Sequence, residues 1–134
     1  MNVSPLVTLA IDEIPAVFVA AACAQGTTRI TGAHELRVKE SDRIATMAAG
    51  LQAMGAAIEE RPDGALITGG ALHGARVQAC SDHRVAMALT MAALRSDGEV
   101  RIGDCDNVRT SFPGFCEMAR SAGLPVHEEY VASV

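Results

Sequence analysis

The sequence predicts a mixed fold of the α/β (α+β) type, in which two copies of a β-α-β-α-β-β unit pack together. Segments of small apolar residues with helical spacing alternate with short segments rich in β-branched residues, and glycines separate many of them. The same order of segments occurs twice, with landmarks that recur at an offset of about 70 residues. We therefore expect repeat units at about residues 12–68 and 75–129, with helices packed inward and sheets outward.

The first unit opens with a helix predicted for residues 12–24. Asp12 is suited to the N-cap, Pro15 falls in the first turn, and small apolar residues form the rest. Gly26 ends this helix, and the β-branched residues at 27–31 predict a short strand.

The second helix of this unit is predicted for residues 41–54. Ser41 or Asp42 can act as its N-cap, and Gly55 ends it. Its spacing predicts one apolar face, which consists of Ile44, Met47, Ala48, Leu51 and Met54.

A hairpin completes the first unit, and the second unit follows the same order. The hairpin strands are predicted at 56–60 and 65–68, joined by the turn Pro62-Asp63-Gly64. The elements predicted for the second unit are a strand at 75–79, a helix at 82–94 opened by Asp82, a strand at 99–102, a helix at 111–123 and a strand at 124–128.

Four landmarks pair in order between the two units. They are Asp12 with Asp82, Thr28-Arg29-Ile30 with Val100-Arg101-Ile102, Gly55 with Gly123, and Ala57-Ile58-Glu59-Glu60 with Val126-His127-Glu128-Glu129. Four ordered matches indicate duplication of one supersecondary unit. Polar loops at matching places would then meet at one end, where helix N-termini could surround an anion.

Length and composition limit the possible functions. A chain of 134 residues is the size of one domain and long enough to bury a core. Its 11 Lys+Arg against 16 Asp+Glu and the absence of Trp disfavour nucleic-acid binding. No apolar run is long enough to span a membrane, and no signal peptide is visible. The 4 cysteines form no C-x-x-C pair, so we expect core residues in a reducing compartment and a cytoplasmic protein.

The most polar segment, residues 36–43, reads L-R-V-K-E-S-D-R. It precedes the apolar part of the helix at 41–54, so Lys39 and Glu40 should lie on the entering loop and Arg43 in the first turn. Such a loop, at the positive end of a helix, is suited to binding an anion and moving a proton beside it. A solvated run of charges is the alternative interpretation.

Five motifs resemble, in their order, those of 5-enolpyruvylshikimate-3-phosphate (EPSP) synthases. They are Asp12-Glu13-Ile14-Pro15, Gly26-Thr27-Thr28, the segment 36–43, Asp82-His83-Arg84-Val85-Ala86-Met87 and Ser111-Phe112-Pro113-Gly114-Phe115. The resemblance implies transfer of the enolpyruvyl group of phosphoenolpyruvate to the 5-hydroxyl of shikimate 3-phosphate, in the shikimate pathway of aromatic amino acid biosynthesis. The L-R-V-K-E-S-D-R wording is nearer to the subgroup that includes glyphosate-tolerant enzymes.

The fold implied by this resemblance has two domains, each built from three β-α-β-α-β-β units, which close around the substrates. The chain would then cover two of the six units, as part of the C-terminal domain, and would lack the N-terminal domain and one further unit. We therefore expect the chain alone to be inactive and to need the missing N-terminal portion as its partner. We also expect self-association through uncovered apolar helix surface.

The resemblance implies acid–base roles for three residues on two loops. Asp12 would contact the shikimate hydroxyls and act as the base for the 5-hydroxyl. Glu40 would protonate the methylene carbon of phosphoenolpyruvate. Lys39 is the alternative proton donor and would lie near both substrates.

The resemblance also implies an anion site. Arg43 and Arg84 would bind phosphoenolpyruvate through their planar forks, which match carboxylate and phosphate groups. His83 would position the same substrate. No metal and no cofactor is implied.

Simpler roles compete with these. Asp12 could be only an N-cap, and His83 a polar residue at a helix start. Arg37 could be structural, paired with Glu35 or Asp42.

Two positions depart from the family pattern, since Glu35 stands where many members have Asn, and Thr110 where many have Lys.

A fragment of a UDP-N-acetylglucosamine enolpyruvyl transferase and a non-catalytic repeat module remain the alternative functions.

Overall fold

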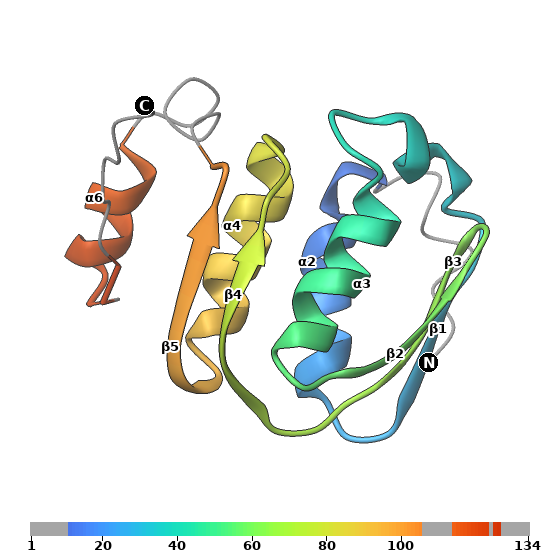
Figure 1. Ribbon diagram of the computed structural model, residues 1–134, viewed down its shortest axis with the longest axis horizontal. Coiled ribbons are helices and arrows are strands. Elements are labelled where there is room, and N and C mark those ends of the chain that lie inside the picture. Colours follow the sequence, from blue (N-terminus) through green and yellow to red (C-terminus); the bar gives the residue numbers. More distant parts are fainter. Residues whose placement is uncertain (1–10, 106–113, 124, 127–134) are drawn as a thin grey trace.

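The computed structural model describes residues 11–105, 114–123, 125 and 126. Helices α2, α3 and α4 lie side by side, with strands around them (Figure 1). In chain order, with η for a 3₁₀ helix, the elements are η1 (Ile11–Glu13), α2 (Ile14–Cys23), β1 (Thr27–Ile30), η2 (His34–Val38), α3 (Arg43–Ala53), β2 (Ala57–Arg61), β3 (Gly64–Thr68), β4 (Leu72–Gln78), α4 (His83–Ala93), β5 (Ser96–Gly103) and α6 (Phe115–Ser121).

The strands form two sheets of different kinds. The first is antiparallel, with the order β1-β3-β2, so that the last strand in sequence lies in the middle. The second is a parallel pair of β4 and β5, joined by α4 in the crossover that parallel strands require. The antiparallel sheet packs on α2 and α3, whereas the parallel pair packs on α3 and α4.

The core lies between these layers. Gly50 of α3 faces Leu89 of α4, and a Cβ at this position would lie only 2.9 Å from Leu89 Cδ2, so the two helices approach closely. Burying one large aliphatic or aromatic side chain contributes about 1.5–3 kcal/mol to folding. Those almost fully buried are Ile14, Phe18, Ile30, Leu36, Ile44, Met47, Leu51, Met54, Ile67 and Leu89.

The structure confirms the mixed fold class and most predicted elements of the described residues. The duplication of a β-α-β-α-β-β unit stays a prediction, and the described residues contain different parts of its two proposed copies. The first copy shows the antiparallel strands after its second helix, and the second copy shows the parallel strands on either side of its first helix. Residues 111–113 of the predicted last helix and residues 124, 127 and 128 of the predicted last strand lie outside the described residues.

One local prediction was wrong. Asp12 is not the N-cap of α2, because Asp12 lies in a 3₁₀ turn that precedes this helix. The Asp12 carboxylate pairs instead with the side chain of Arg43. Lys39 and Glu40 lie on the loop that enters α3, as predicted, and the residues just before them form η2. The buried side chain of Leu36 holds that short helix against the core.

Adjacent glycines after β3 provide a test of the packing. A Cβ on Gly69 would lie 1.5 Å from the carbonyl oxygen of Ala24, whereas one on Gly70 meets nothing within 4 Å. We expect Gly69→Ala to lower the free energy of unfolding by about 1–3 kcal/mol, because backbone must move. Gly70→Ala should stay within about 0.5 kcal/mol of the wild type. Urea denaturation of both variants measures this, and equal midpoints would contradict the packing described for Gly69.

Candidate active site

The polar segment after η2 leads directly into α3. Asp42 is the N-cap of this helix, with extended backbone angles and a carboxylate that accepts a hydrogen bond from Ala45 N at 3.1 Å. Of the two predicted caps, Asp42 is therefore the one used. Ser41 instead donates its hydroxyl to Asp82 Oδ2 at 2.8 Å, which ties the segment to the start of α4.

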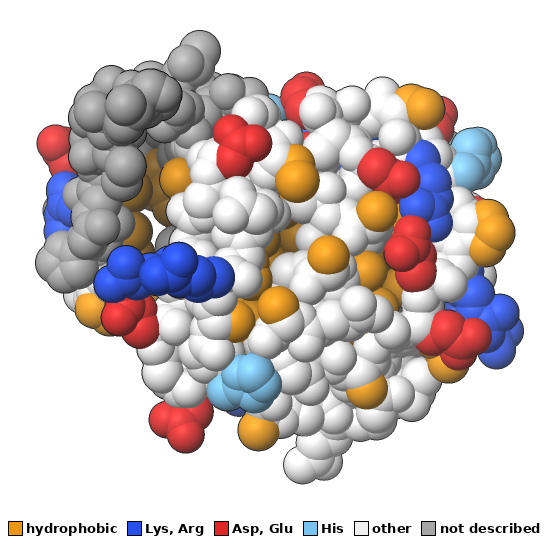
Figure 2. Space-filling view, in the orientation of Figure 1, with side chains coloured by type: hydrophobic (Ala, Val, Ile, Leu, Met, Phe, Trp, Pro, Cys, Tyr) orange, Lys and Arg blue, Asp and Glu red, His pale blue; other side chains and the backbone are white. Residues whose placement is uncertain are grey.

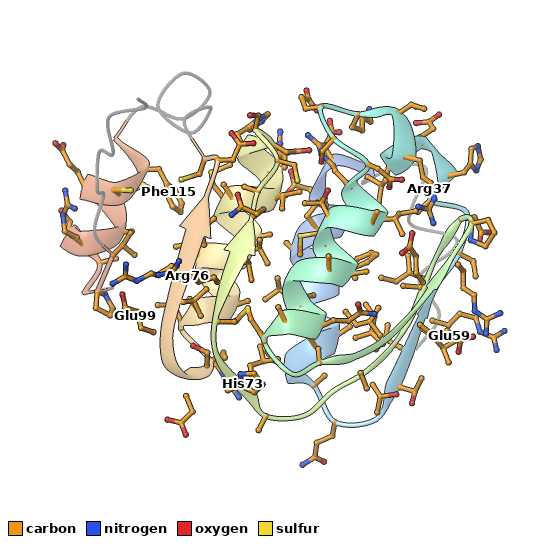
Figure 3. All side chains as sticks on the ribbon, viewed as in Figure 1. Arg37, Glu59, His73, Arg76, Glu99 and Phe115 are labelled. Atoms are coloured by element: carbon orange, nitrogen blue, oxygen red, sulfur yellow. The ribbon has the colours of Figure 1, made fainter. Side chains whose placement is uncertain are left out.

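Arg37 fastens this segment to the β2–β3 hairpin (Figure 3). Its guanidinium donates to the carbonyl oxygens of Arg61 and Pro62 and forms ion pairs with Glu60 and Asp42, at 2.6 and 2.9 Å. The bonds to Glu60 and then Asp42 raise the pKa of Arg37 above its ordinary value. The structural role predicted for Arg37 is confirmed for Asp42, and the hairpin is an anchor that sequence reasoning missed.

Arg43 is the centre of the charged cluster. Its side chain is only 2% exposed and meets three carboxylates from three segments. Nε donates to Asp82 Oδ2 at 2.8 Å, Nη2 to Glu40 Oε2 at 2.6 Å, and Nη1 to Asp12 Oδ1 at 3.3 Å. One buried cation thus gathers η1, the loop before α3 and the start of α4.

Two further cations lie at the rim of this cluster. Lys39 Nζ is 3.6 Å from Asp12 Oδ1, and Arg84 donates to the carboxylate of Glu13 at 2.9 Å. Because Glu13 follows Asp12 directly, Arg84 reaches the same turn as Lys39. These rim side chains are partly exposed and can meet an anion from solvent.

The structure thus brings together most of the predicted site residues. Ion pairs link Lys39 to Asp12, Asp12 to Arg43 and Arg43 to Glu40. Arg84 pairs with Glu13, the residue after Asp12. The partly buried His83 lies between Asp82 and Arg84 at the first turn of α4. The fixed cations can bind an anion, and the exposed carboxylates beside them can exchange a proton with it.

Asp82, which the sequence places at a helix start and in the motif of residues 82–87, also belongs to the charged cluster. Its carboxylate is fully buried and also caps α4 through Arg84 N and Val85 N. Burial alone would raise the pKa of Asp82, but the hydrogen bonds from Arg43, Ser41 and the Val85 backbone outweigh it, so the pKa lies below 3.8. The N-cap position was visible in the sequence, whereas the bond to Arg43 was not.

The lowered pKa of Asp82 predicts how folding responds to acid. A depressed folded-state pKa contributes stability above the unfolded value of 3.8, and this contribution is lost as pH falls through the folded pKa. As the pH falls from about 5 to about 2, the free energy of unfolding should decrease more for the wild-type chain than for the Asp82→Asn variant. Urea denaturation at several pH values measures this, and parallel pH curves for the two proteins would contradict it.

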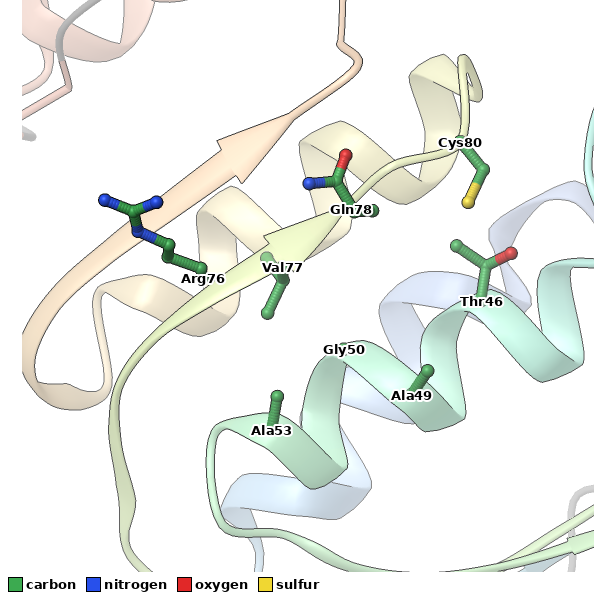
Figure 4. Close-up of a pocket in the computed structure, with 8 residues that line it drawn as sticks. All are labelled: Thr46, Ala49, Gly50, Ala53, Arg76, Val77, Gln78 and Cys80. Atoms are coloured by element: carbon green, nitrogen blue, oxygen red, sulfur yellow. The ribbon is translucent and has the colours of Figure 1, made fainter.

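A shallow groove lies apart from the charged cluster. It has a volume of about 230 Å³ and runs between α3 and β4 (Figure 4), where the lining residues are Thr46, Ala49, Gly50, Ala53, Arg76, Val77, Gln78 and Cys80. Over α3 this face carries few charged side chains (Figure 2). The lining contains none of the predicted site residues.

Solved structures show the class to which this fold belongs. The chain is similar to an EPSP synthase structure from Acinetobacter baumannii, with a TM-score of 0.85 and 49% sequence identity, over 88% of this chain and 28% of that chain. A second structure of an EPSP synthase from the same organism gives a TM-score of 0.86 at 43% identity. The fold is therefore that of part of an enolpyruvyl transferase domain.

Sequence relatives define the family. The family model of EPSP synthase (3-phosphoshikimate 1-carboxyvinyltransferase) matches residues 3–118, and the chain belongs to this family. A 3-phosphoshikimate 1-carboxyvinyltransferase from Acidithiobacillus ferrooxidans is 65% identical over 119 residues, which are 89% of this chain and 28% of the relative. One from Halorhodospira halophila is 60% identical over 122 residues, 90% of this chain and 28% of the relative.

The chain therefore spans little more than a quarter of the length of these relatives. Among the helices that the structure describes, none has the length and apolar character needed to cross a bilayer.

Proposed function

We propose that this chain is part of an enzyme that transfers the enolpyruvyl group of phosphoenolpyruvate to the 5-hydroxyl of shikimate 3-phosphate and releases phosphate. Family membership supports this reaction over a UDP-N-acetylglucosamine enolpyruvyl transferase and over a non-catalytic module. The observation that carries the proposal is that Asp12 and Glu40 both pair with the guanidinium of Arg43, while Lys39 pairs with Asp12.

The cations bind the substrate anions in this proposal. Arg43 and Arg84 bind phosphoenolpyruvate, and His83 helps to position it. Lys39 lies near both substrates. In the structure Lys39, Arg43 and Arg84 are paired with carboxylates, which carry a negative charge like the substrate groups that these cations would bind.

The carboxylates move protons in this proposal. Asp12 accepts the proton of the 5-hydroxyl as its oxygen adds to the enol carbon, and Glu40, with Lys39 as the alternative donor, protonates the methylene carbon. Loss of phosphate and of one methyl proton from the tetrahedral adduct then restores the double bond. Both carboxylate side chains are 50% exposed, so substrates can reach them.

The remaining parts of the site come from sequence outside this chain. The chain matches about 28% of its relatives, so we propose that the rest of the enzyme supplies further contacts to shikimate 3-phosphate and excludes water from the site. The chain alone should not turn over. Its exposed apolar residues, among them Ala16 and Ala20 on α2 and Met91 on α4, would favour self-association. The cysteine pattern, which contains no C-x-x-C pair, supports a reducing, cytoplasmic location.

A chimeric enzyme tests the proposal. In this chimera, the chain replaces the 119 matched residues of the Acidithiobacillus ferrooxidans relative, and phosphate release is measured with both substrates. We expect turnover that needs both substrates and is absent from the 134-residue chain alone. A chimera that folds cooperatively but releases no phosphate would overturn the proposed function, and robust turnover by the chain alone would overturn the need for a partner.

A further inference from the structure

Asp82 uses the two oxygens of its carboxylate for different tasks. Oδ1 accepts hydrogen bonds from the backbone N–H groups of Arg84 and Val85, at 3.0 and 3.3 Å, and so fixes the first turn of α4. Oδ2 accepts from Arg43 Nε and Ser41 Oγ, both at 2.8 Å. The residue has no exposed surface, so solvent does not compete for these bonds.

This arrangement determines which edge of the Arg43 guanidinium is presented to the site. The bond from Nε, beside the aliphatic stem, is made to a fully buried carboxylate. Within the described part of the chain, the two Nη groups at the far edge are held by Asp12 and Glu40, whose side chains are half exposed. An incoming anion can displace exposed carboxylates far more easily than a buried one, because water can solvate the group that leaves.

We propose that Asp82 is the positioning residue of the anion site, holding Arg43 by Nε so that a carboxylate or phosphate group of the substrate binds the Nη edge in exchange for Glu40 and Asp12. This inference rests on the proposed function and deepens it. The same exchange releases the two carboxylates to which acid–base roles are assigned, at the moment when the substrate arrives. Asp82 acts through Arg43 and does not itself touch the substrate.

Asparagine at this position separates positioning from simple packing. It has the size of aspartate but carries one N–H₂ group in place of an oxygen. Whichever way the amide is turned, that group faces donors, either the backbone N–H groups of α4 or the Arg43 and Ser41 side chains. Asp82→Asn therefore weakens the hold on Arg43 without leaving a cavity.

The test compares Asp82→Asn with Asp63→Asn in the active chimera. Asp63 undergoes the same chemical change and accepts one backbone hydrogen bond, from Gly32 N at 2.9 Å, away from the charged cluster. We expect Asp82→Asn to raise the KM for phosphoenolpyruvate about ten- to a hundredfold, as for loss of a charge-assisted hydrogen bond, with a smaller effect on the KM for shikimate 3-phosphate. Asp63→Asn should leave both KM values unchanged.

Ser41→Ala provides a graded second variant, because it removes one neutral hydrogen bond to the same oxygen of Asp82. We expect a rise of about two- to tenfold in the KM for phosphoenolpyruvate, even if Asp82→Asn does not fold. An unchanged KM for phosphoenolpyruvate in a folded Asp82→Asn variant, or in Ser41→Ala when Asp82→Asn is unfolded, would overturn the inference. Equal rises in both KM values would also overturn it. An inactive wild-type chimera would instead overturn the proposed function.

Discussion

Glu40→Gln in the chimeric enzyme should lower kcat by about 10²–10⁴-fold, the loss expected when an acid–base group is removed. The amide cannot deliver a proton to the methylene carbon of phosphoenolpyruvate. In the free protein, however, Glu40 holds Arg43 Nη2 at 2.6 Å and so competes with the substrate anion for it. The KM for phosphoenolpyruvate should therefore stay the same or fall, which is an unusual combination for a residue in a binding site.

Steady-state kinetics with each substrate varied in turn measures kcat and the two KM values separately. Glu59→Gln is the matched control, because Glu59 is exposed on β2 (Figure 3) and pairs with Arg61 of the same strand, at 3.1 Å. It should leave both constants unchanged. Wild-type kcat in Glu40→Gln would remove this residue from the mechanism and leave Lys39 as the proton donor.

Asp12→Asn should also lower kcat, but with a different signature. Asp12 is the proposed base, and it lies between Lys39 and Arg43, at 3.6 and 3.3 Å. Asparagine cannot accept the proton of the 5-hydroxyl, so we expect the lost rate near neutral pH to recover in part as pH rises. Recovery of the rate at high pH, where hydroxide can replace a missing base, would support the role of Asp12 as base. No effect at any pH would exclude it.

Helix α3 shows what could be predicted from sequence. Its apolar spacing predicted a helix at 41–54, and the structure has α3 at Arg43–Ala53 with that face buried. The sequence limits the N-cap to Ser41 or Asp42, and the structure uses Asp42. These features depend on neighbours within a few positions, which is why a local pattern contains them.

The partners of Arg43 show what could not. Of the three carboxylates that bind Arg43, Glu40 lies three positions away along the chain, whereas Asp12 and Asp82 lie 31 and 39 positions away. Nothing in the pattern around Asp82 distinguishes an N-cap that bonds only backbone from one that also holds a buried arginine. The resemblance to EPSP synthases indicated which residues should meet, and only the packing of η1, α3 and α4 shows through which atoms they do.

The same network predicts the largest stability effect in the chain. Arg43→Met replaces a side chain that is 2% exposed and leaves the carboxylate of Asp82, which has no exposed surface, without its cation. Removing one partner of a buried ion pair costs about 3–5 kcal/mol, because the remaining charge stays buried. Arg84→Met is the matched control, since its pair with Glu13 is exposed and should contribute about 0–1 kcal/mol.

A double-mutant cycle in urea shows whether the uncompensated charge is the cause. Adding Asp82→Asn to Arg43→Met removes the charge that the single variant leaves buried, so the double variant should lose less unfolding free energy than the sum of the two singles. Asp12 and Glu40 are half exposed and can be solvated once Arg43 is gone, so they should contribute little to the loss. Additive losses would show that Arg43 stabilises the fold by packing its aliphatic stem, and that the pair with Asp82 has no special part in stability.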